Sequence, residues 1–181
     1  MKFTERSNGY YLEDITETEI RFANLAGRPT KSIYDDPNNP KHVYVLWIYD
    51  KEVATSLANM NINVKEITDE KNGSVKYSVQ LKAYPKMRLN RKTGQNEQVP
   101  KVMLRTLEST VRLSAKSFGL VDGSHVSTCD IRFHPWQYDE RKPDCVAVID
   151  ELWVSIDEGA GEVDETYLSE KYGYEEELPF V

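Results

Sequence analysis

Residues 74–84 alternate between apolar and polar side chains with a period of two, which is typical of a β-strand. One face is apolar, and the other is basic and ends in an aromatic ring. Their members are Val75, Tyr77, Val79, Leu81 and Ala83 on the first face, and Lys76, Ser78, Gln80, Lys82 and Tyr84 on the second. This pattern predicts a sheet that buries one face in a core and presents cations to solvent on the other.

The rest of the chain consists of short strand patterns with few helices. Strands are predicted over residues 20–25, 42–49, 62–67, 101–107, 126–138 and 144–156, the last two joined as a hairpin. Asp50 is a predicted N-cap for a short helix that ends near residue 61, and a second helix is predicted within residues 113–122. Since strands and helices do not alternate, we predict a mainly β fold: an oligonucleotide-binding (OB) fold-like five-stranded β-barrel with extra strands and one or two short helices.

Charge is divided unevenly along the chain. Residues 157–181 hold nine of the 30 acidic residues and one of the 23 basic ones, although the whole chain has a net charge of -7. Within residues 74–118, ten basic residues are accompanied only by Glu97 and Glu108. This division predicts a disordered acidic tail over residues 157–181, which is too polar to bury a core. Residues 1–19 are polar with weak strand signals, which predicts an irregular N-terminal arm, and the OB-fold domain is predicted over residues 20–156.

Cations and aromatic rings occur together on the strand face described above and in two long segments read as loops, residues 26–41 and 85–100. A single-stranded nucleic acid needs cations along its phosphates and flat rings on which its bases can stack. The pattern therefore predicts sequence-independent binding of single-stranded nucleic acid. The candidate residues are Arg28, Lys31, Tyr34, Lys82, Tyr84, Lys86, Arg88, Arg91, Lys92, Lys101 and Arg105.

The roles predicted for the aromatic residues depend on their neighbours in the sequence. Those in strongly apolar runs are predicted to pack in the core: Tyr44, Trp47 and Tyr77. Tyr34 and Tyr84 lie beside basic and turn residues, which suits either base stacking or an ordinary surface position. Trp136 and Tyr138 end a predicted strand, where they either stack on bases or cap the barrel.

The sequence contains no enzymatic constellation. It has no glycine-rich phosphate loop, no Gly-x-Ser-x-Gly motif and no zinc-ligand spacing. Asp150 and Glu151 are adjacent in a predicted strand, so they point to opposite faces and cannot act as a pair. We therefore predict a protein that is not an enzyme and has no metal or cofactor. The alternatives are a protein–protein adaptor with an OB-like scaffold and, less favoured, a metal-dependent nuclease.

Cys129 and Cys145 form neither a disulfide framework nor a metal motif, which predicts free thiols in a reducing compartment. The first eleven residues have no apolar signal region, and the run 43–49 is too short to span a bilayer. We therefore expect no membrane partner and a cytoplasmic location, in the host cytoplasm if the protein is viral. Homo-oligomerisation is left open.

Two longer motifs frame the predicted domain. The opening motif is IRFANLAG, then a basic loop, then HVYVLWIYDKEVATSLANMNINVKEI, and the closing hairpin is CDIRFHPWQYDERKPDCVAVIDELWVSIDE. Over residues 20–158 these resemble a family of bacteriophage single-stranded DNA-binding proteins. The resemblance implies an OB-fold barrel, without a cofactor, that coats single-stranded DNA during replication and recombination. It points to Arg21, Phe22, Asn24, Gly27, Ile131, Arg132 and Trp136 as DNA contacts or as determinants of the fold.

The chain departs from that family in its long polar N-terminal arm and its longer, more basic segment 85–100. Its end, EEELPFV, resembles the tails of bacterial single-stranded DNA-binding proteins, in which acidic residues and a terminal Pro-Phe dock on replication and repair enzymes. The resemblance implies that replication or recombination proteins bind Glu175, Glu176, Glu177, Leu178, Pro179 and Phe180, although here Val181 follows the ring. The tail's charge also predicts that it competes with DNA for the basic groove, more strongly at low salt.

Overall fold

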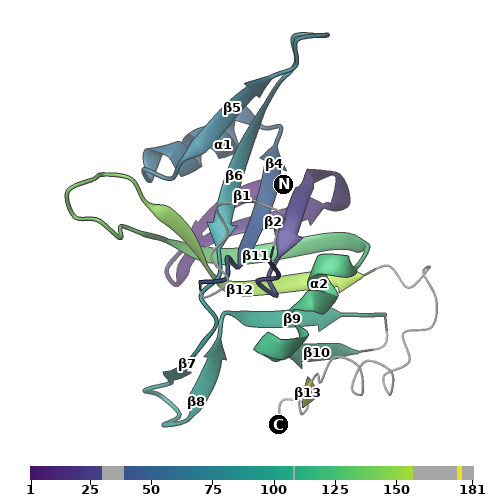
Figure 1. The fold of residues 1–181 in the computed structure, drawn as a ribbon, viewed down its shortest axis with the longest axis vertical. Coiled ribbons are helices and arrows are strands. Elements are labelled where there is room, and N and C mark those ends of the chain that lie inside the picture. The colour runs from purple at the N-terminus through teal and green to yellow at the C-terminus, as the bar shows by residue number, and fades with distance from the viewer. Residues whose placement is uncertain (30–38, 108, 157–174, 177–181) are drawn as a thin grey trace.

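The computed structural model describes residues 1–29, 39–107, 109–156 and 175–176, and it is mainly β (Figure 1). The helices are α1 (Lys51–Asn59) and α2 (Gly119–Gly123), with 3-10 turns at Glu17–Glu19 and Ala115–Ser117. The predicted mainly β architecture with short helices is confirmed. The strands are β1 (Lys2–Arg6), β2 (Gly9–Thr16), β3 (Ile20–Asn24), β4 (Val43–Ile48), β5 (Val64–Thr68), β6 (Val75–Lys82), β7 (Lys86–Leu89), β8 (Asn96–Val99), β9 (Lys101–Arg105), β10 (Thr110–Leu113), β11 (Val126–Trp136), β12 (Val146–Ile156) and β13 (Glu175–Glu176).

Among the described strands, all but β7 and β8 belong to one sheet whose main path runs β1-β2-β11-β12-β6-β4-β3. One edge of β12 pairs antiparallel with β11. Its other edge is shared: Ala147 and Val148 pair in parallel with β6, and the stretch from Glu151 to Ser155 pairs in parallel with β9. The sheet therefore branches at β12, and the outer surface of β6 continues onto the outer surface of β11 and β12.

The core lies on the inner face of this sheet, and it is filled by alternate residues of the strands. On β4 the even-numbered residues Tyr44, Leu46 and Ile48 are fully buried. Helix α1 closes the core with a one-sided apolar stripe. Its N-cap is the predicted Asp50, whose side chain accepts a hydrogen bond from the Glu52 N–H at 2.7 Å. The predicted core position of Tyr44 and the predicted helix are thus confirmed.

The N-terminal segment differs from the irregular arm predicted over residues 1–19. It forms the β1–β2 hairpin, and β2 pairs with β11 inside the main sheet. Leu12 and Ile15 of β2 are fully buried, so this hairpin contributes to the core. The prediction is wrong because the alternation of β2 is broken by Asp14, which adopts a positive φ of 56° and hides the strand period.

The segment 85–100 also differs from its prediction as a loop. It contains the β7–β8 hairpin, which forms a two-stranded sheet of its own and projects from the body as an arm (Figure 1). Its turn is fixed by Asn90, whose side chain accepts a hydrogen bond from the Lys92 N–H at 2.9 Å, and by Gly94 at a φ of 71°. In β7 the basic Lys86 and Arg88 alternate with the apolar Met87 and Leu89, but all four residues are exposed, so this short alternation does not mark a core-facing strand.

The two cysteines are free, as predicted. Burial raises the pKa of the Cys129 thiol to about 12, whereas Cys145 is only half-buried. Because the thiolate is the reacting species, we expect iodoacetamide at pH 8 to label Cys145 and to spare Cys129 until the protein unfolds. Mass spectrometry of the labelled native protein should show one adduct, at Cys145, and two adducts in denaturant. Rapid double labelling of the native protein would contradict this placement.

Two residues of the acidic tail are described. Glu175 and Glu176 form β13, which pairs antiparallel with β10 opposite Arg112 and Val111. The other predicted partner-binding residues, Glu177, Leu178, Pro179 and Phe180, lie outside the described residues, as does most of the tail expected to be disordered. In the described chain, neither helix has the length and apolar character needed to cross a bilayer.

Candidate nucleic-acid interface

The outer face of β3, β4 and β6 is hollowed, and we call this surface the sheet-face hollow. Alternate residues of these strands fill the core, so the intervening side chains point outward. Among the residues that the structure describes, its lining includes three cations, an exposed ring, Phe22, and no carboxylate, so these residues give it positive charge. Its lining is Arg21, Phe22, Val45, Ile62, Asn63, Lys65, Ser78, Gln80, Lys82 and Cys145.

A second hollow, the aromatic cleft, lies where the β7–β8 arm meets β11 and β12. Tyr84 and Trp136 meet edge to face with ring centroids 5.7 Å apart, and Tyr138 lies 6.4 Å from Trp136. These rings are 41%, 46% and 59% exposed respectively, which favours stacking on bases over capping of the core. The cleft is lined by Tyr84, Lys86, Met87, Arg88, Leu89, Val99, Pro100, His134, Trp136, Val148, Ile149 and Asp150.

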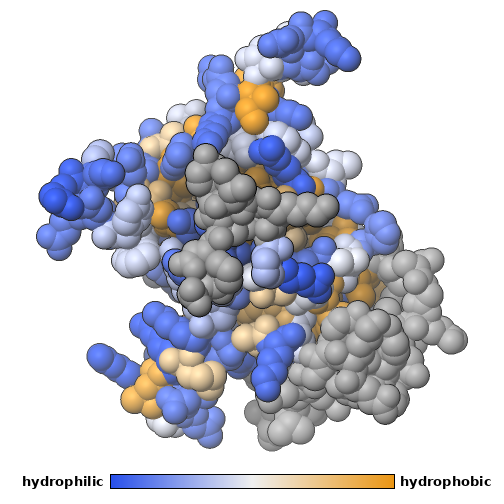
Figure 2. Space-filling model, in the orientation of Figure 1, coloured by the Kyte–Doolittle hydropathy of each residue, from blue (hydrophilic) through white to orange (hydrophobic). Residues whose placement is uncertain are grey.

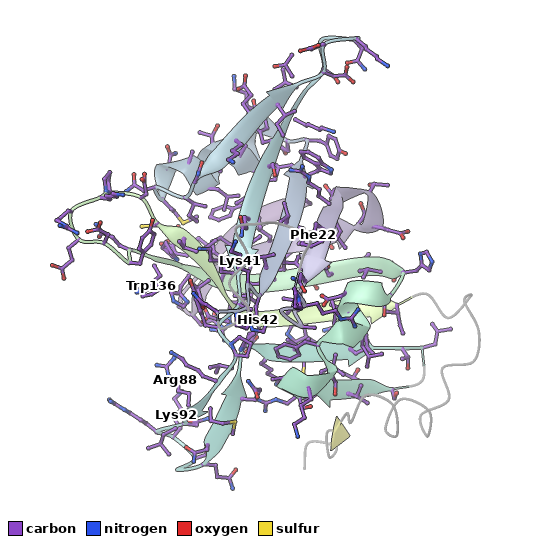
Figure 3. All side chains as sticks on the ribbon, viewed as in Figure 1. Phe22, Lys41, His42, Arg88, Lys92 and Trp136 are labelled. Atoms are coloured by element: carbon purple, nitrogen blue, oxygen red, sulfur yellow. The ribbon has the colours of Figure 1, made fainter. Side chains whose placement is uncertain are left out.

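The β7–β8 arm supplies one wall of the cleft and much of its charge. Arg88 and Lys92 project from the arm in Figure 3, where Trp136 is labelled on the neighbouring hairpin. Figure 2 shows an apolar patch on this otherwise hydrophilic arm, where Met87 and Leu89 are exposed. The arm therefore combines cations for phosphates with apolar surface for bases.

The two hollows adjoin. Lys82, which lines the sheet-face hollow, pairs in register with Val148, which lines the aromatic cleft. Tyr84 follows two residues after Lys82 and carries the surface into the cleft. We call the combined surface the basic-aromatic track and define it as Arg21, Phe22, Lys65, Lys82, Tyr84, Lys86, Arg88, Trp136 and Tyr138.

The cations of the track are available for an external anion. In the residues that the structure describes, none of Arg21, Lys65, Lys82, Lys86 and Arg88 forms an ion pair with a carboxylate, and the same holds for Arg91 and Lys92 at the tip of the arm. Elsewhere cations are neutralised: Arg6 pairs with Glu13, for example. The one carboxylate in the cleft lining, Asp150, lies 2.9 Å from Nδ1 of His134. Positive charge therefore accumulates along the track.

Several predicted DNA-binding residues lie away from the track lining. Lys101 and Arg105 lie over the ring of Trp153, at 5.5 Å and 4.4 Å from its centroid. Arg132 forms an ion pair with Glu151 at 3.0 Å. Contact of these three cations with DNA stays a prediction. Lys31 and Tyr34 lie outside the described residues.

The opening motif contributes to the fold as well as to the track. Asn24 fixes the start of the following segment: its side chain accepts a hydrogen bond from the Arg28 N–H at 2.8 Å and donates one to the Arg28 carbonyl at 2.9 Å. Gly27 has a φ of 66°, and a Cβ there would approach the His42 ring to 2.5 Å. Ile131 of the closing hairpin is fully buried. Asn24, Gly27 and Ile131 are therefore determinants of the fold, whereas Arg21 and Phe22 belong to the track.

Trp47 is the residue that the sequence interpretation misplaced. The continuous apolar run of β4 suggested a strand buried on both faces, with Trp47 in the core. In the structure Trp47 points outward with Val45 and is only partly buried, because its neighbours Leu46 and Ile48 occupy the core face. The sequence held no signal that could have placed it outward, because Val43, Val45 and Trp47 are as apolar as the residues on the core face. Tyr77, by contrast, packs against the core as predicted.

The described residues contain no group of three or more His, Cys, Asp or Glu side chains able to hold a metal ion. No protein-family model matches the chain, and no curated protein matches it either.

Solved structures with a similar arrangement are phage single-stranded DNA-binding proteins. The protein of bacteriophage Enc34, determined in complex with single-stranded DNA, aligns with a TM-score of 0.47 and 12% identity over 85% of this chain and 93% of its own. The gp2.5 protein of bacteriophage T7 aligns with a TM-score of 0.37 and 10% identity over 94% of this chain and 97% of its own. They are of the class that the sequence motifs resemble.

Proposed function

We propose that this chain binds single-stranded DNA without sequence preference along the basic-aromatic track. The observation that carries the proposal is the exposed trio of Tyr84, Trp136 and Tyr138 beside cations that no described carboxylate neutralises. In a duplex the bases are already stacked and paired, so exposed rings beside cations favour a single strand. Every base has a flat face, which explains binding without a sequence code. On this reading the protein protects single strands during DNA replication and recombination and performs no catalysis.

The test removes three track cations at once. Phosphate contacts release counterions, so the affinity of Lys82→Gln/Lys86→Gln/Arg88→Gln for oligo-dT should depend less on salt, with the slope of log K against log salt shallower by about 2. Fluorescence anisotropy across a salt series measures this slope. Lys51→Gln is the matched control, because Lys51 is an exposed lysine at the start of α1 that lines neither hollow. A triple variant with the slope of the control would contradict the proposed path of the strand.

We further propose that the acidic tail recruits replication or recombination proteins through residues 175–180 and competes with DNA for the track. The pairing of β13 with β10 supports an acidic segment that reaches the body of the protein.

Deleting residues 157–181 should therefore strengthen binding to oligo-dT at low salt. The gain should shrink as the screening length falls from about 30 Å at 0.01 M to about 8 Å at 0.15 M ionic strength. Anisotropy at the two ionic strengths measures the effect, and pull-down of replication or recombination partners by the two proteins measures recruitment. Equal affinity at low salt would exclude competition, and equal capture of a partner would exclude recruitment.

A further inference from the structure

The indole of Trp47 is contacted by two cations on the outer face of the sheet. Cζ of Arg21 lies 4.5 Å from the ring centroid and Nζ of Lys76 lies 4.0 Å from it. Both distances are within the range of about 6 Å over which a cation interacts with an aromatic face. Arg21 comes from β3 and Lys76 from β6, the two strands that flank β4. The two cations therefore reach the ring from the strands on either side of its own.

A base that approached Trp47 would compete with these cations for the ring. Stacking requires a free aromatic face, and the charged groups of Arg21 and Lys76 already lie over this ring. Trp136 is different: its neighbour Tyr84 meets it at an interplanar angle of 82°, and almost half of its surface is exposed. The two tryptophans of the track region therefore suit different parts of a nucleic acid.

Arg21 and Lys76 can still bind a phosphate while they contact the ring of Trp47. In the described chain neither Arg21 nor Lys76 forms an ion pair with a carboxylate. A guanidinium carries five N–H donors and an ammonium three, so both cations can donate to a phosphate. A long side chain that is already held in one place loses less conformational freedom when it binds an anion. Phe22, the exposed ring next to Arg21, provides a face on which a base can stack beside the phosphate contacts.

We propose that Arg21, Trp47 and Lys76 form a phosphate-binding post, in which Trp47 is a positioning residue that holds two cations against the phosphates of the bound strand. The post rests on the proposed function and adds Trp47 and Lys76 to its site. The strand's backbone crosses the sheet face at the post, and its bases stack on Phe22 and in the aromatic cleft.

A mutant cycle distinguishes a positioning role of Trp47 in the phosphate-binding post from a role in stacking on bases. The variants are Trp47→Leu, Arg21→Gln/Lys76→Gln and the triple combination, with Lys51→Gln as the control for loss of a lysine. If Trp47 acts through the two cations, Trp47→Leu weakens oligo-dT binding in the parent protein and has no further effect in the Arg21→Gln/Lys76→Gln background. The salt dependence should fall along with the affinity in both Trp47→Leu and the double variant. A stacking role predicts instead a loss of about 5- to 150-fold in both backgrounds.

Tryptophan fluorescence provides a second measurement, in which the response of Trp47 itself to DNA is observed. The variant Trp136→Phe/Trp153→Phe leaves Trp47 as the only tryptophan, and Trp47→Phe/Trp153→Phe leaves Trp136. On saturation with oligo-dT we expect strong quenching of Trp136 and little quenching of Trp47. Strong quenching of Trp47 would overturn the post while leaving DNA binding intact. Failure of the unmodified chain to bind oligo-dT would overturn the proposed function and the post together.

Discussion

Replacing Trp136 by alanine should weaken binding to oligo-dT by about 1–3 kcal/mol, the usual contribution of one stacked base. Trp136 is the central ring of the aromatic cleft, because it contacts both Tyr84 and Tyr138. Its removal takes away a stacking face and also loosens the edge contact that orients Tyr84. Anisotropy with a labelled oligonucleotide measures the loss, which we expect to persist at high salt because stacking releases no counterions.

Trp136→Phe is the matched control for that loss. Phenylalanine retains a flat apolar face, so it should recover most of the affinity that alanine loses. Both variants should melt close to the parent protein, because the ring is nearly half exposed and belongs to the surface. If the alanine variant bound as tightly as the parent, Trp136 would have no stacking role and the aromatic cleft would be a passive surface.

Replacing Phe133 by alanine should lower the free energy of unfolding by about 3–5 kcal/mol. Phe133 is fully buried on β11, and its ring lies 6.0 Å from that of Tyr10 on β2. The cavity would open where the N-terminal hairpin joins the main sheet, so the variant also tests whether residues 1–19 belong to the folded domain. Urea denaturation followed by circular dichroism measures the change.

Phe22→Ala serves as the control for Phe133→Ala, since Phe22 is 45% exposed on the track. It should change stability by less than about 1 kcal/mol while weakening DNA binding. A small stability loss in Phe133→Ala, comparable to that of Phe22→Ala, would mean that the β2–β11 junction is not part of the cooperative core.

Where a strand has one buried and one exposed face, its position and its site residues could be predicted from the sequence. The alternation in residues 74–84 placed Lys82 on an outer face and Leu81 in the core, because a period of two separates the faces without knowledge of the partner strands. The charge count likewise located the cations of Lys86 and Arg88 before their arm was known. Local patterns were sufficient in these cases.

Elements stabilised by distant partners escaped prediction. Trp47 was assigned to the core because its strand is apolar on both faces, and only the cations from β3 and β6 explain why a tryptophan suits its outer face. The position of Arg132 beside Glu151 depends on the register between β11 and β12, which the sequence does not specify. In the β7–β8 arm, β7 is exposed throughout and β8 is only partly buried, so the four-residue alternation of β7 did not mark a core-facing strand.

The most direct test of the central claim compares the affinity of the full chain for a labelled oligo-dT with its affinity for a duplex of equal length at low salt. We predict clear binding of the single strand, weakening as salt rises, and much weaker binding of the duplex. Absence of binding to the single strand, or equal affinity for both, would contradict the proposal. Absence of binding together with capture of a protein by the tail would favour an adaptor instead.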